Sequence, residues 1–96
     1  MKNSKSTLGY FEVINDSTAT YEQVLKAAKK QGYNFMFRWI NSDNSWTFFQ
    51  TTFGKAEKAA VELYMSEKKE YDREFAKKYY SEYVDIIEVS EALNDI

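Results

Sequence analysis

Residues 32–54 constrain the fold of this chain more than any other stretch. They contain two runs rich in aromatic and β-branched residues, separated by five small polar residues at positions 41–45, with Gly32 and Gly54 at the ends. Two strand-forming runs joined by a short polar connection are typical of a β-hairpin. We therefore expect a hairpin here, against which the neighbouring segments pack.

The length of the turn decides which side chains of the hairpin share a face. A three-residue turn at positions 43–45 sets Trp39 across from Phe49, whereas a two- or four-residue turn sets Trp39 across from Phe48. We favour the three-residue turn because it gathers five apolar rings on one inward face. Those rings are Phe35, Phe37, Trp39, Phe49 and Phe53, and the opposite face then carries Arg38, Trp46, Phe48 and Gln50.

The composition fits one small folded domain. Of the 96 residues, 44% are hydrophobic and 18% are aromatic, which is enough apolar surface for a single core. We expect a flexible N-terminus at residues 1–7 and a single α+β domain over residues 8–96. The sequence has no signal peptide and no apolar stretch long enough to span a membrane, so we expect a cytoplasmic protein without a membrane partner.

The segments around the hairpin predict further strands and helices. Residues 8–14 are predicted as a first strand, and Thr20 with Gln23 matches a capping box that begins a helix ending at Gly32. Helical spacing then continues from Lys55 to about residue 83, with a break near residues 66–72 as an option. One apolar stripe of this helix includes Tyr71, Phe75 and Tyr79.

Residues 84–89 are β-branched enough to form a last strand, which completes a β-α-β-β-α-β order. That order predicts a ferredoxin-like two-layer sandwich, with one antiparallel sheet and two helices on one face. The first and last strands would then be the central pair of the sheet. The alternative is a β-α-β-β order followed by an all-helical C-terminal half, because residues 84–89 could equally continue the helix.

The residue types exclude most catalytic chemistry. The chain has no His and no Cys, so it lacks the usual general base, a thiolate nucleophile and the commonest metal ligands. Its three glycines are too far apart for a phosphate-binding loop. A carboxylate site for Mg²⁺ at Glu70, Asp72 and Glu74 is disfavoured, since a helix points Asp72 away from the other two. We therefore expect no enzyme activity, no cofactor and no bound metal.

The C-terminal segment is the most distinctive candidate site. Residues 81–96 hold five acidic residues and no Lys or Arg, whereas residues 1–80 hold all 13 basic residues and the other 10 acidic ones. Tyrosines beside carboxylates make a good protein-binding surface, because tyrosine offers a large contact area at low entropy cost. The predicted partner-binding residues are Tyr79, Tyr80, Glu82, Tyr83, Asp85 and Glu88, with Arg38, Trp46 and Phe48 as a second patch.

These features predict a non-catalytic protein-binding module, such as a small stoichiometric inhibitor or adaptor. An acidic surface can imitate the charge of a phosphate backbone, so the expected partner is a basic nucleic-acid-binding protein or nuclease. A second hypothesis is the binding of single-stranded nucleic acid on an aromatic sheet face, although Arg38 is the only cation of the hairpin. A third is a self-associating subunit, such as a homodimer, and the acidic segment could also serve only solubility.

Overall fold

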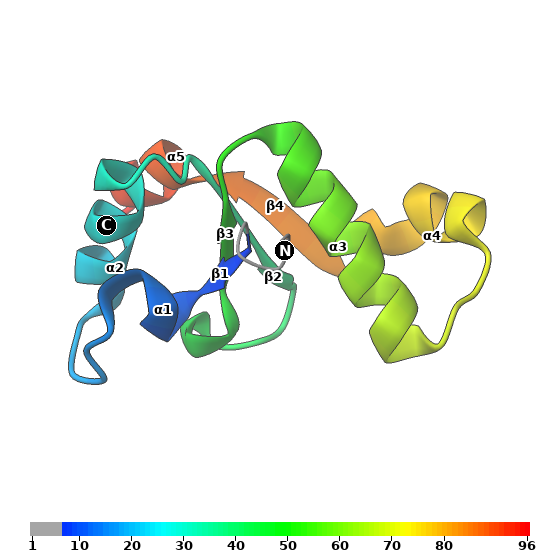
Figure 1. The fold of residues 1–96 in the computed structure, drawn as a ribbon, viewed down its shortest axis with the longest axis horizontal. Coiled ribbons are helices and arrows are strands. Elements are labelled where there is room, and N and C mark those ends of the chain that lie inside the picture. Colours follow the sequence, from blue (N-terminus) through cyan, green and yellow to red (C-terminus); the bar gives the residue numbers. More distant parts are fainter. Residues whose placement is uncertain (1–6) are drawn as a thin grey trace.

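Figure 1 shows a four-stranded antiparallel sheet between two groups of helices in the computed structural model. The structure describes residues 7–96, apart from the side chain of Ser45. Within this part of the chain the strand order is β1-β3-β2-β4, and all neighbouring strands are antiparallel. The strands are β1 (Leu8–Gly9), β2 (Phe35–Trp39), β3 (Phe48–Gln50) and β4 (Val84–Glu88). The predicted α+β class is confirmed, whereas the expected flexible N-terminus lies, except for Thr7, outside the described residues.

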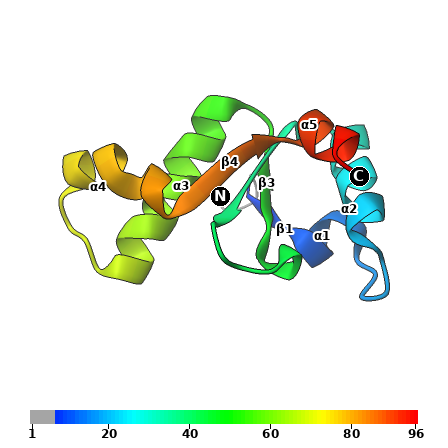
Figure 2. The same ribbon diagram turned by 180° about the vertical axis from the view of Figure 1, so that it is seen from behind.

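The helices cover both faces of the sheet. Their bounds are α1 (Tyr10–Ile14), α2 (Tyr21–Lys30), α3 (Phe53–Lys68), α4 (Arg73–Tyr79) and α5 (Val89–Asn94), with two short 3₁₀ turns, η2 (Asn44–Trp46) and η3 (Tyr80–Glu82). Figures 1 and 2 show α1, α2 and α5 on one side of the sheet and α3 and α4 on the other. The observed architecture therefore differs from the predicted ferredoxin-like sandwich, in which two helices share one face.

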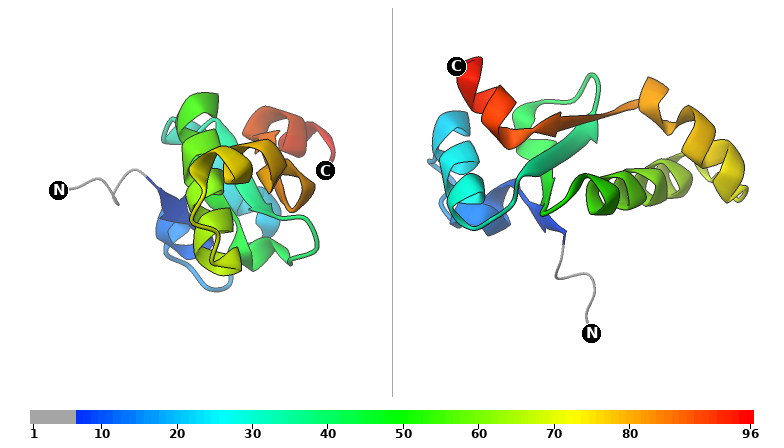
Figure 3. Two further views of the ribbon diagram at one scale, coloured as in Figure 1. Left: turned by 90° about the vertical axis from the view of Figure 1, so that its right-hand side faces the viewer. Right: turned by 90° about the horizontal axis from the view of Figure 1, so that it is seen from above.

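Apolar residues on both sheet faces explain why helices are needed on both sides. Met36 and Phe49 lie opposite each other on one face, and Phe37 and Phe48 lie opposite each other on the other face. Each face builds its own core, and Figure 3 shows the sheet between the two helix groups from above. The first core contains Tyr10, Val13, Val24, Leu25, Ala28, Met36, Phe49, Val89 and Ala92. The second core contains Phe37, Ala56, Ala60, Val61, Tyr64, Ala76, Tyr80 and Val84.

The hairpin is present, but its predicted register is wrong. Met36 pairs with Phe49 and Phe37 pairs with Phe48, so neither the preferred nor the alternative partner of Trp39 is observed. The connection is longer than five residues because Trp46 lies in the turn η2 and not in a strand. Phe49 therefore faces the first core, on the opposite side of the sheet from Phe37. Phe53 begins α3 and is not part of β3.

The first and last strands lie at the two edges of the sheet, so their predicted central position is wrong. The first strand ends at Gly9, and residues 10–14 form α1 instead of continuing the strand. The side chain of Glu12 accepts a hydrogen bond from the Gly9 backbone N–H, which favours a helical turn at this point. The last strand at Val84–Glu88 is confirmed, so the all-helical C-terminal half is excluded.

The long predicted helix is interrupted near residues 66–72, where a break was considered possible from the sequence. Lys69 ends α3 in the left-handed conformation, with a φ of 55°. Asp72 then caps α4, because its carboxylate accepts hydrogen bonds from the backbone N–H groups of Glu74 and Phe75. The break turns α4 away from the line of α3, and α4 lies at the end of the molecule farthest from α2 (Figures 1 and 2).

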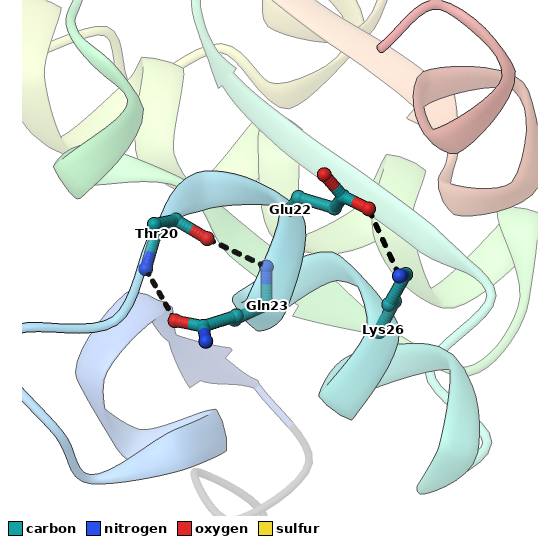
Figure 4. A network of polar contacts seen from close by, with 4 residues as sticks. All are labelled: Thr20, Glu22, Gln23 and Lys26. Carbon is teal, nitrogen blue, oxygen red and sulfur yellow. Dashed lines mark hydrogen bonds and ion pairs between the residues drawn. The ribbon is translucent and has the colours of Figure 1, made fainter.

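The capping box that predicts α2 is confirmed in detail (Figure 4). The Thr20 hydroxyl accepts a hydrogen bond from the Gln23 backbone N–H at 3.2 Å, and the Gln23 side chain accepts one from the Thr20 backbone N–H at 2.8 Å. An ion pair between Glu22 and Lys26, at 2.9 Å, joins the first turn of α2 to the next. Gly32 follows the helix with a φ of 92°, as expected for a residue that ends a helix in the left-handed region.

Candidate functional site

The aromatic side of α4 faces solvent. The sequence predicts that Tyr71, Phe75 and Tyr79 continue the apolar stripe of one long helix, yet Tyr71 is 87% exposed and Phe75 is 44% exposed. The rings of Phe75 and Tyr79 pack against each other, with their centroids 4.6 Å apart. Ala76 is buried on the inward side of α4. We call Phe75 and Tyr79 the aromatic face of α4, and Tyr71 lies in the connection before this helix.

Tyr80 belongs to the second core rather than to this surface. Its side chain is only 7% exposed, and its hydroxyl donates a hydrogen bond to the Glu57 carboxylate at 2.9 Å. Glu57 lies on α3, so this bond ties the turn after α4 to α3. Of the three neighbouring tyrosines in the predicted site, only Tyr79 and Tyr83 keep part of their rings at the surface.

The environment of Tyr80 predicts a specific dependence of stability on pH. Burial, and then the bond to Glu57, raise the pKa of Tyr80 from 10.0 to about 12. The pKa of Tyr80 is higher in the folded state than in the unfolded state. The neutral Tyr80 hydroxyl therefore contributes its full stabilisation below pH 10.0, and this contribution is lost as the pH rises through about 12. We expect Tyr80→Phe to lower the free energy of unfolding by about 1 kcal/mol at neutral pH and to flatten the alkaline decline.

Urea unfolding across this pH range measures both effects, with Tyr79→Phe as the control for a tyrosine outside the core. An unchanged alkaline decline in Tyr80→Phe would contradict the raised pKa assigned to Tyr80.

Tyr83 forms a second aromatic group against α3. It is 42% exposed, and its ring centroid lies 5.6 Å from that of Tyr64. The Lys68 ammonium group lies 4.7 Å from the Tyr83 ring centroid and 5.7 Å from that of Trp39. Cation–π contacts of this kind hold the rings in place, and the Tyr83 residue remains partly exposed.

The acidic residues of the predicted site are exposed but do not share one face. Glu82 lies on η3, while Asp85 and Glu88 lie on β4. Asp85 is paired with Arg38, whereas Glu88 is paired with Phe35, so strand alternation places the two carboxylates on opposite sheet faces. None of the three forms an ion pair with another residue of the described chain. The negative charge is therefore distributed along both sides of β4.

The second predicted patch is divided by the structure. Arg38 donates a hydrogen bond to the Asn44 side chain, and Trp46 is 63% exposed on η2. Phe48 is half-buried beside the second core and stacks on Phe37, with the ring centroids 5.4 Å apart. Helices cover both faces of the sheet, so Trp46 and Phe48 do not form an open aromatic platform.

A groove of about 520 Å³ lies between α3 and α4, but the predicted site residues do not line it. Its lining contains three cations and one carboxylate among Gly54, Glu57, Lys58, Val61, Arg73 and Lys77. Arg73 is already paired with Glu62, and Glu57 accepts the Tyr80 hydroxyl. Within the described chain, no group of three or more His, Cys, Asp or Glu residues is arranged to hold a metal ion.

Comparison with protein-family models, curated proteins and solved structures finds no match to this chain. None of the described helices combines the length and apolar character that crossing a membrane requires. Any function must therefore be inferred from the residues themselves. The helical spacing did not indicate the exposure of Tyr71 and Phe75. Asp72 was the available signal, because a helix that starts anew at this cap can turn a different side inward.

Proposed function

We propose that this protein is a non-catalytic protein-binding module that acts as a stoichiometric inhibitor or adaptor. The exposed aromatic face of α4 is the observation that carries this proposal. Large aromatic rings are enriched at protein interfaces, and a folded monomer gains little by leaving two of them in contact at its surface. Tyr83 lies in the segment that follows and adds a third anchored ring to the candidate surface.

The acidic residues support a partner with a basic surface. Glu82, Asp85 and Glu88 are exposed, and none is neutralised by a cation within the described chain. Complementary charge steers association and selects partners more than it adds affinity. A basic protein that binds nucleic acid in the cytoplasm fits this charge, and the module would occupy the surface that otherwise holds phosphates.

The buried tyrosines, which lie outside the candidate surface, offer no activated nucleophile. Burial raises the pKa values of Tyr10, Tyr64 and Tyr80 above 10.0, which makes their reactive phenolate forms scarcer at neutral pH. Activation of a nucleophile requires the opposite shift or a neighbouring base. The absence of His and Cys from the sequence removes the usual base and the usual thiolate.

Capture from source-cell lysate, with and without nuclease treatment, tests this proposal. We expect one protein partner that remains bound in stoichiometric amount after nuclease treatment and is lost from a Phe75→Ser, Tyr79→Ser variant. Phe11→Ser is the matched control, because Phe11 is 48% exposed on α1, away from α4. Partners that disappear on nuclease treatment, or equal capture by both variants, would contradict the proposal.

A further inference from the structure

Within residues 7–96, β4 is an edge strand with one unpaired side. In this part of the chain it pairs with β2 alone, and β1, which has only two residues, forms the other edge of the sheet. In the view from above in Figure 3, β4 runs along one side of the sheet between η3 and α5. An edge of five residues that is unpaired on one side is long enough to template another strand.

The pairing of β2 with β4 determines which backbone groups of β4 point outward. The Ile40 N–H donates to the Tyr83 carbonyl at 2.8 Å, and the Val89 N–H donates to the Asn34 carbonyl at 2.9 Å. Because bonded and non-bonded pairs alternate in an antiparallel ladder, Asp85 and Ile87 also bond toward β2. The N–H groups between them, those of Val84, Ile86 and Glu88, then point to the free edge.

These outward groups have no hydrogen-bond partner within residues 7–96. We propose that the free edge of β4 is the docking site for an extended segment of a basic partner, which joins the sheet as a further strand. This inference rests on the proposed protein-binding function and specifies how that partner is held. The aromatic face of α4 and the β4 edge are connected through η3, so one partner can contact both.

The side chains of β4 specify the chemistry of the added segment. Asp85 and Glu88 lie three positions apart and project from opposite sheet faces. A strand laid against β4 alternates its own side chains in the same way, so two cations three positions apart would each face one carboxylate. The best-matched segment therefore has Lys or Arg at positions i and i+3, with β-forming residues between them.

A second copy of this chain is a poorer occupant of the edge. Residues 81–96 hold five acidic residues and no basic ones, so pairing two β4 strands would bring two such segments together. Like charges placed across or diagonal to each other destabilise strand pairs. Acidic residues on this edge therefore oppose self-association while they favour a basic strand.

Glu88 offers a substitution that blocks the edge without disturbing the fold. Its φ is −67°, the value to which proline is restricted, and its side chain is exposed. Its N–H points outward, so proline at this position removes no bond to β2. Ile87, the preceding residue, is already in an extended strand, as a residue before proline must be. Glu88→Gln is the matched control, because it removes the charge and keeps the N–H.

The probe is an acetylated and amidated heptapeptide of threonine and valine that carries two lysines three positions apart. Its binding is measured by nuclear magnetic resonance titration and amide hydrogen exchange. We expect the peptide to slow exchange at Val84, Ile86 and Glu88, and to bind Glu88→Pro about tenfold more weakly than Glu88→Gln. A version with glutamates in place of the lysines should not bind.

The proposed docking site would be overturned if the lysine peptide does not bind or if it binds the two Glu88 variants with equal affinity. Equal binding of the lysine and glutamate peptides would also overturn it. Concentration-dependent dimerisation that Glu88→Pro abolishes would assign the edge to a second copy and would also overturn it. If the captured partner needs Phe75 and Tyr79 but binds Glu88→Pro normally, the edge proposal fails and the proposed function stands.

Discussion

Replacing Phe49 by Ala is expected to lower the free energy of unfolding by about 3–5 kcal/mol. Phe49 is fully buried, lies opposite Met36 and packs in the first core with Val24 and Leu25 of α2. Deleting its ring removes apolar burial and leaves a cavity between the sheet and α2, which the surrounding helices can fill only in part. Urea unfolding monitored by circular dichroism measures the change.

Phe53→Ala is the matched control for this prediction. The register expected from the sequence placed Phe53 inside with Phe49, whereas the structure leaves Phe53 50% exposed at the start of α3. Its edge-to-face contact with Phe35, at 5.8 Å between centroids, is worth about 1 kcal/mol. Equal destabilisation by Phe49→Ala and Phe53→Ala would contradict the observed register.

Replacing Phe75 and Tyr79 together by Ser should weaken binding to the captured partner by about 30-fold or more. Truncating one aromatic residue that dominates an interface costs about 2 kcal/mol or more, which is about 30-fold in affinity. About 30-fold is therefore the smallest loss expected for the pair. The fold should tolerate the change, because the inward side of α4 depends on Ala76 and on the Tyr80 that follows it. Isothermal titration of the purified partner measures the loss.

Two observations would separate a lost contact from a lost fold. The double variant should keep the circular dichroism spectrum of the wild type, and its free energy of unfolding should fall by no more than about 1 kcal/mol. Phe11→Ser, on the α1 side of the sheet, should bind the partner with unchanged affinity. Unchanged binding by the Phe75 and Tyr79 variant would remove α4 from the interface.

The structure confirms the predicted elements whose sequence signals are local. The Thr20 capping box and Gly32 delimit α2 because both depend on residues within one helical turn. The β-branched run of β4 and the break before Asp72 are also local, and both are confirmed. Tyr79 and Glu82 are predicted in a helix, and the structure places them in α4 and in the 3₁₀ turn η3. The residues of β4 are predicted in a strand, as observed.

Long-range features could not be obtained in the same way. The hairpin register depends on the longer connection that contains η2, and a polar five-residue run gave no sign that Trp46 would leave the strand. Phe48 and Phe49 are adjacent apolar residues, so either could face a given core. Coverage of both sheet faces follows only from the true register, which turns Phe49 toward α2 and Phe48 toward α3.

The candidate site shows the same limit. Tyr79 and Tyr80 are neighbours of equal type, and only the start of α4 at Asp72 decides that Tyr80 turns inward to Glu57. The five acids of the C-terminal segment could be counted in the sequence, but their distribution on both sides of β4 required the pairing with β2. The free edge itself follows from the strand order, which has no local signal.

The most direct test of the proposed docking on a basic partner is the salt dependence of its affinity. A variant with Glu82→Gln, Asp85→Asn and Glu88→Gln keeps the shape of these side chains and removes three charges. Complementary charges predict that this variant binds the captured partner more weakly at low salt and that its affinity falls less steeply as salt is added. Identical affinity and an identical salt slope for the variant and the wild type would contradict the proposed docking.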